Sequence, residues 1–193
     1  MSSRRAGRGD GSRSGTLCGR SVCAWPVALI LAVAVFGNGA STAATIRGTV
    51  SCRGGEDCSG AVVYVDRISG RVFPPGPEVF VDQEQITFVP RVLTVVTGTP
   101  VVFLNSDDVW HNVFSVSEAK RFNLGTNARG SCRRLVFDKP GIVELLCNVH
   151  SEMSAFIVVA GTPYSAMVKP DGTYALEQVP AGACTVVAWC NEL

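Results

Sequence analysis

Almost every apolar run in this 193-residue chain is short, rich in β-branched residues and bounded by Gly, Pro, Asn or Asp. Runs of this length and composition are typical of β-strands. Beyond the N-terminal region, no stretch of about a dozen residues shows helical periodicity. The sequence therefore predicts an all-β fold, either a sandwich or a barrel. The expected strands are Ile46–Val50, Ala61–Asp66, Val92–Val96, Val101–Leu104, Arg134–Phe137, Ile142–Leu146, Ala155–Val159, Thr173–Leu176 and Cys184–Trp189.

Residues 1–44 have the organisation of an export signal. A basic segment that ends at Arg20 is followed by the apolar run Pro26–Phe36 and then by small residues up to Ala44. The apolar run is well short of the ~20 residues that span a bilayer, so we expect a cleaved signal peptide and no stable membrane insertion. Cleavage after Ala43 or Ala44 would leave a periplasmic or secreted protein.

Removal of this segment changes the charge of the chain. Five of the 17 Lys and Arg residues and one of the 16 Asp and Glu residues lie in it, which leaves 12 basic against 15 acidic side chains, a net charge of −3. An acidic protein without a basic patch is a poor partner for nucleic acid or for an anionic membrane. We therefore expect no nucleic-acid partner.

The expected mature chain keeps six cysteines, namely Cys52, Cys58, Cys132, Cys147, Cys184 and Cys190. In an oxidising compartment this even number favours disulfides. Cys52 and Cys58 bracket a turn-like segment and predict a local bridge. Cys184 and Cys190 cannot bridge each other on one extended strand, where each residue advances ~3.3 Å. If Cys147 binds a metal, five cysteines remain and the other pairings stay open.

The segment Cys147–Met153 places a thiolate, an imidazole and a thioether at Cys147, His150 and Met153. The only other histidine of the chain, His111, lies in a separate segment upstream. Two imidazole nitrogens, one cysteine sulfur and one weak methionine sulfur form the donor set of a blue-copper site. The expected strands on both sides of the loop would hold these donors in place. The sequence therefore predicts a copper centre built from these four residues.

The two segments also resemble a known family, the cupredoxins. Phe103-Leu104-Asn105 with Trp110–Phe114 resembles the first-histidine segment of plastocyanin and amicyanin, and Phe137–Gly141 with Cys147–Met153 resembles their C-terminal ligand loop. The resemblance is closest to exported cupredoxin-like proteins of the methylamine-utilisation type. These share the patterns around Asp82-Gln83, Phe88-Val89-Pro90 and Thr162-Pro163-Tyr164.

The resemblance implies a Greek-key β-sandwich that binds one type 1 copper ion through His111, Cys147, His150 and Met153. It implies that Asn112 forms a hydrogen bond toward the Cys147 loop and holds the two ligand segments together. The expected organisation is an N-terminal β segment at 45–76, a copper domain at 77–160 and a C-terminal β-hairpin segment at 161–193. The flanking segments resemble a carboxypeptidase regulatory-like sandwich. They depart from that pattern at Trp189–Leu193, so we expect a truncated edge.

By resemblance, the expected function is the transfer of single electrons between redox partners, without substrate chemistry, so we do not expect an enzyme. A cytochrome c or a quinoprotein-type dehydrogenase fits the role of partner. His150 would be the ligand nearest the surface, and Val149 would lie in the contact patch. The alternative is a copper-binding or storage module, or a structural sandwich without a role in electron transfer.

Each residue also has a simpler interpretation. Cys147 could be a buried half-cystine, and Met153 could simply fill the core. Zinc suits one Cys and two His, although a thioether is a poor zinc ligand. A thiol hydrolase would need an acid to orient its histidine, but Asp107-Asp108 is more simply interpreted as a solvated turn.

Overall fold

The computed structural model describes residues 43–52, 58 and 60–191, and the predicted signal peptide lies almost entirely outside this range. The described residues form fourteen strands and no helix, which confirms the prediction of an all-β fold. Within these residues, no helix is therefore long and apolar enough to cross a membrane. The strands are β1 (Ala43–Thr49), β2 (Val62–Ile68), β3 (Val79–Glu84), β4 (Thr87–Val89), β5 (Val92–Val96), β6 (Pro100–Leu104), β7 (His111–Ser115), β8 (Phe122–Asn127), β9 (Cys132–Val136), β10 (Gly141–Leu146), β11 (Ser154–Ala160), β12 (Ser165–Met167), β13 (Thr173–Pro180) and β14 (Cys184–Trp189).

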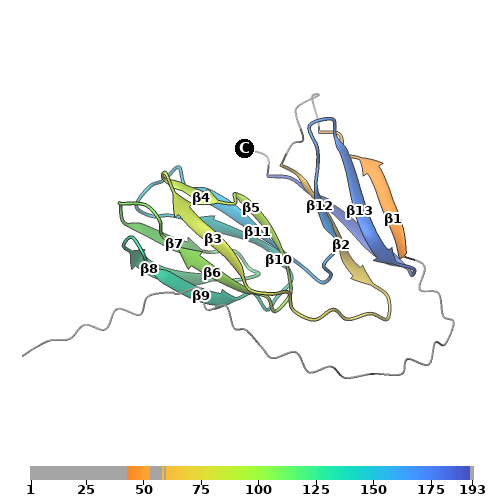
Figure 1. Ribbon diagram of the computed structural model, residues 1–193, viewed down its shortest axis with the longest axis horizontal. Helices are drawn as coiled ribbons and strands as arrows, with labels where there is room; N and C mark the ends of the chain where they lie inside the picture. The colour runs from red at the N-terminus through yellow and green to blue at the C-terminus, as the bar shows by residue number, and fades with distance from the viewer. Residues whose placement is uncertain (1–42, 53–57, 59, 192–193) are drawn as a thin grey trace, which may run out of the picture. The chain divides into compact units, whose positions relative to one another are not determined.

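Strands β3 to β11 form a sandwich of two sheets (Figure 1). One sheet has the order β5-β11-β10-β7-β8 and the other has the order β4-β3-β6-β9. Neighbouring strands are antiparallel, except for the parallel pairs β5 with β11 and β3 with β6. The chain changes sheets on entering β5, β6, β7, β9 and β10. Alternate side chains of both sheets meet in one apolar core, which includes Val81, Phe103, Val113, Phe137, Val143, Leu145 and Ile157.

The flanking segments pair with each other rather than with the sandwich strands. Strand β1 pairs with β13, and β2 lies between β12 and β14. Their apolar side chains form a second core that includes Ala61, Val63, Val65, Leu176 and Val179. Strands from the two ends of the described sequence therefore form these sheets together, and the strands of the sandwich, β3 to β11, lie between them in the sequence.

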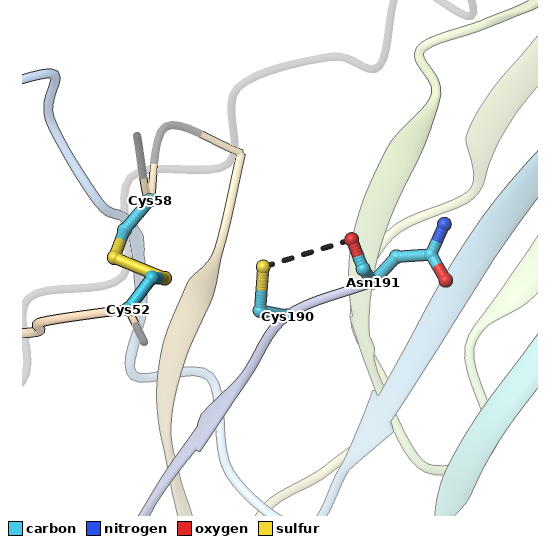
Figure 2. Close-up of a disulfide and its surroundings, with 4 residues drawn as sticks. All are labelled: Cys52, Cys58, Cys190 and Asn191. Atoms are coloured by element: carbon cyan, nitrogen blue, oxygen red, sulfur yellow. Dashed lines mark hydrogen bonds between the residues drawn. A yellow bond between two sulfur atoms is a disulfide. The ribbon is translucent and has the colours of Figure 1, made fainter. Parts of the chain in front are cut away.

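The predicted bridge between Cys52 and Cys58 is present, and Figure 2 shows it beside Cys190. Both half-cystines and Cys190 pack in the second core. The Cys190 thiol lies 3.7 Å from the carbonyl oxygen of Asn191. Cys184 opens β14 and Cys190 follows its last residue, and neither forms a disulfide.

Five strands were not expected from the sequence, namely β3, β4, β7, β8 and β12. Their burial explains why. In β7 the buried side chains include His111, Asn112 and Ser115, so the strand lacks an alternation of apolar and polar residues. In β3 the pattern is misleading, because Gln83 is buried while Phe80 is half exposed. Buried polar residues therefore hide β3 and β7 from a pattern based on hydrophobicity.

Candidate metal centre

The loop Cys147–Met153 joins β10 to β11 at one end of the sandwich. These strands form an antiparallel ladder whose last pair is Leu146 with Ser154, so both ends of the loop are fixed by sheet pairing. Inside the loop, the backbone N–H of Met153 donates a hydrogen bond to the carbonyl of His150 at 3.2 Å. The loop is therefore short, closed at its base and braced within.

His111 comes from the neighbouring strand. It is the first residue of β7, and its side chain is 0% exposed. Strand β7 pairs with β10 through Phe114 and Leu146, which brings the start of β7 to the same end of the sheet as the loop. Pairing of His111 with Asn127 on β8 fixes its backbone from the other side.

The structure brings three of the four predicted ligands together. Ligand atoms of His111, Cys147 and His150 all lie within 4.8 Å of one another. The two imidazole rings face each other through their Nδ1 atoms, which are 3.0 Å apart. Two Nδ1 lone pairs at this distance repel each other unless a proton or a cation lies between them. The arrangement is therefore suited to hold a positive charge.

Met153 is buried in the same apolar cluster as Cys147, at the end of the loop. Its burial fits both a weak thioether ligand and a core-filling side chain. Cys147 is 5% exposed and forms no disulfide, so the half-cystine interpretation of this residue is wrong in the structure.

The Asn112 side chain links the two ligand segments. Its Nδ2 donates a hydrogen bond to Oδ1 of Asn148 at 3.1 Å, between β7 and the Cys147–Met153 loop. This hydrogen bond joins the strand that carries His111 to the loop that carries Cys147 and His150. It adds to the backbone pairing of β7 with β10.

Asp107 does not lie in a solvated turn, contrary to the sequence interpretation. Its Oδ2 lies 2.8 Å from Nε2 of His111, and its side chain is only 15% exposed. Burial alone would raise the pKa of this carboxyl. Hydrogen bonds from the Ile86 N–H, the His111 ring and the Gln85 N–H outweigh burial and lower the pKa of Asp107 below its ordinary value. The solvated-turn interpretation holds only for Asp108, which is exposed and pairs with Arg129.

Asn105 is a second residue whose role was missed. Its buried amide donates hydrogen bonds to the carbonyls of Val109, at 3.0 Å, and Asn127, at 2.9 Å. Its Oδ1 accepts a hydrogen bond from the N–H of Asp107 at 2.9 Å. One side chain thus shapes the turn between β6 and β7. Asn followed by Ser and Asp is a turn signal that could have indicated it.

The donor set fits a copper ion. Two nitrogens that each lie about 2.0–2.1 Å from one tetrahedral metal ion are about 3.3 Å apart, close to the distance between the two Nδ1 atoms. Because Nε2 of His111 faces a carboxylate, the neutral ring carries its proton there and leaves Nδ1 as a lone-pair donor. The buried thiol supplies the soft ligand that copper prefers.

Exposed apolar side chains flank both histidines. Val109 and Trp110 precede His111, and Val149 precedes His150. Trp110 is 60% exposed, which is unusual for an indole ring. We refer to Val109, Trp110 and Val149 as the apolar rim. His111 is fully buried, whereas His150 is partly exposed.

Neither a protein-family model nor a curated protein matches this sequence. Solved structures to which the chain is similar include cupredoxins and a copper-containing enzyme. A purple cupredoxin from Nitrosopumilus maritimus is 22% identical, with a TM-score of 0.39, over 42% of this chain and 99% of its own. A reduced amicyanin mutant is 20% identical, with a TM-score of 0.40, over 50% of this chain and 97% of its own.

The third is a copper-containing nitrite reductase from Thermus scotoductus, 27% identical with a TM-score of 0.42. It is matched over 50% of this chain, which spans only 25% of the length of the enzyme.

Proposed function

We propose that this chain is a type 1 copper protein that carries single electrons between redox partners outside the cytoplasm. The observation that carries the proposal is the convergence of ligand atoms of His111, Cys147 and His150, which all lie within 4.8 Å of one another. Met153, buried beside Cys147, supplies the fourth donor. In this proposal the copper domain spans 77–160, and the segments 45–76 and 161–193 form the flanking sheets.

A bound copper ion would supply a one-electron couple between Cu(II) and Cu(I). The residues of the chain bind it and keep the donor positions constant between the two states. His111 is fixed by β7 and by Asp107, and the loop is fixed by the Leu146–Ser154 pair. Little reorganisation of the ligands then accompanies the change of charge, which favours fast electron transfer.

The same donor set argues against substrate chemistry at the metal. Catalytic metal sites keep one position open for water or substrate, whereas structural sites are closed by protein ligands. Here two imidazoles, a thiolate and a thioether would together supply four protein donors to the ion, the donor set of a copper electron-transfer site. We therefore propose an electron carrier rather than an enzyme.

His150 is the proposed exit for the electron. Its ring is partly exposed, whereas His111 is buried and Cys147 nearly so. The exposed side chains of the apolar rim, which are next to His111 and His150 in the sequence, offer apolar contact surface for a partner. The proposed partner is a redox protein, such as a cytochrome c or a quinoprotein-type dehydrogenase, with a complementary apolar patch around its own cofactor.

The proposal is tested by loading the metal-free protein with Cu(II). We expect an intense visible thiolate-to-copper band that disappears on reduction and returns on oxidation. Cys147→Ser should abolish the band, whereas the matched control Cys184→Ser, which changes an exposed cysteine of β14, should keep it. A protein that binds copper but stays colourless with Cys147 reduced would instead be a storage module, and the electron-transfer proposal would fail.

A further inference from the structure

The Asp107 carboxylate is surrounded by three hydrogen-bond donors. Its Oδ1 accepts from the N–H of Gln85 at 2.6 Å, and its Oδ2 accepts from the N–H of Ile86 at 2.9 Å. The same Oδ2 lies 2.8 Å from Nε2 of His111. This carboxylate therefore connects the tip of the β3–β4 hairpin to the buried imidazole.

The hairpin tip is an unusual turn. Gln85 and Ile86 form a two-residue loop between the paired Glu84 and Thr87, and both have positive φ, 51° and 57°. Such a type I′ turn normally contains Asn or Gly, and a β-branched residue in this region of backbone space is strained. Strain of this kind persists where the surroundings compensate for it. Here the compensation is the pair of N–H groups that both point at one carboxylate.

Asp107 is thereby fixed from a part of the sandwich that carries none of the proposed ligands. With its oxygens held by the turn, the carboxylate offers His111 an acceptor at one position only. An ionised carboxylate accepts a hydrogen bond from Nε2–H but cannot donate one, so the neutral ring is held as the Nε2–H tautomer. The Nδ1 lone pair then points toward His150 and Cys147.

We infer that Asp107 is a positioning residue of the metal centre: anchored on the Gln85–Ile86 turn, its carboxylate fixes the tautomer of His111 and adds a negative charge that favours Cu(II) over Cu(I). A carboxylate behind a ligating histidine raises the basicity of that ligand, and loss of such a partner typically costs 10–100-fold in metal affinity. The redox half of this inference rests on the proposed function. The claim that Asp107 fixes the tautomer of His111 concerns the metal-free protein alone.

A purely structural role would be different. If Asp107 only stabilised the hairpin turn, its loss would lower stability and leave the tautomer of His111 and the preference for Cu(II) unchanged. The chain offers a matched control for charge, because Asp108 is the next residue, has the same side chain and is 84% exposed beside Arg129.

The experiment compares Asp107→Ala, Asp107→Asn and Asp108→Asn with the parent protein. Nitrogen-15 NMR of the metal-free proteins reports the tautomer of each histidine. Asp107→Ala should release His111 from the Nε2–H form, and Asp108→Asn should not. Redox titration of the copper-loaded proteins then gives the ratio of Cu(II) to Cu(I) affinity. We expect a fall of tenfold or more for Asp107→Ala, which corresponds to a rise of about 59 mV in potential for each tenfold.

Asp107→Asn keeps an acceptor oxygen but loses the charge, so it serves if the alanine variant does not fold. It should lower the affinity ratio several-fold more than Asp108→Asn does. An unchanged His111 tautomer in Asp107→Ala, or equal ratios for Asp107→Asn and Asp108→Asn, would overturn the inference. If the parent protein bound no copper, the proposed function would fail, and the NMR comparison would still decide whether Asp107 positions His111.

Discussion

Replacement of Asn105 by Ala tests whether one buried amide builds the turn that presents His111. Asn105 is 2% exposed, and its side chain makes three hydrogen bonds to backbone groups of the segments around the site. Alanine can adopt the backbone conformation of Asn105, but it removes all three side-chain hydrogen bonds. We expect lower stability together with a loosened His111.

The magnitude follows from where the three partners lie. The carbonyl of Asn127 belongs to a buried residue, so loss of its donor costs about 1–3 kcal/mol. The groups of Val109 and Asp107 lie on a loop that water reaches, and each lost bond there costs about 0.5–1.5 kcal/mol. Together we expect a loss of about 2–6 kcal/mol. For a domain of 150–250 residues this lowers Tm by about 4–24 °C.

Urea unfolding of the metal-free protein measures this change. Asn123→Ala is the matched control, because Asn123 is exposed on β8 and its side chain makes one local bond to the N–H of Gly125. The control should change the free energy of unfolding by no more than about 0.5 kcal/mol. If the two variants lost equal stability, or if Asn105→Ala lost less than about 1 kcal/mol, the role given to this amide would be refuted.

Two further predictions concern Met153 and acid stability. Met153→Leu should keep copper bound and raise the reduction potential, because a thioether donor is replaced by a hydrocarbon; redox titration measures this, and an unchanged potential would show that Met153 only fills the core. Asp171 has a lowered pKa, because its carboxylate accepts hydrogen bonds from the hydroxyl and N–H of Thr173. A lowered pKa contributes stability that is present above the ordinary value of about 3.9 and is lost as the pH falls through the folded value. Asp171→Ala should therefore flatten the acid side of the stability profile, as urea midpoints across this range would show, and an unchanged slope would contradict the assignment.

The candidate donor residues could be proposed from the sequence because their chemistry is carried by residue type and spacing. Cys147, His150 and Met153 lie within one loop, and the loop is flanked by two strands that the apolar pattern indicates. His111 followed because the chain has no other histidine. Their convergence in space could not be derived from the sequence, because it depends on the pairing of β7 with β10.

The supporting residues were harder to predict for a physical reason. Asp107 and Asn105 are polar and lie in a turn, where polar residues are usually solvated. What makes them part of the site is a contact with residues 85–86 in one case and with residue 127 in the other. Such contacts join segments about 20 residues apart and leave no periodic trace in the sequence.

The strained Gln85–Ile86 turn has a consequence for how this protein can change over generations. A turn of Asn and Gly would adopt the same backbone without strain and would no longer depend on a carboxylate beneath it. Substitutions at positions 85, 86 and 107 are therefore not independent. In a family of homologous chains, we expect bulky turn residues to occur together with Asp107 and Asn-Gly turns to occur with or without it.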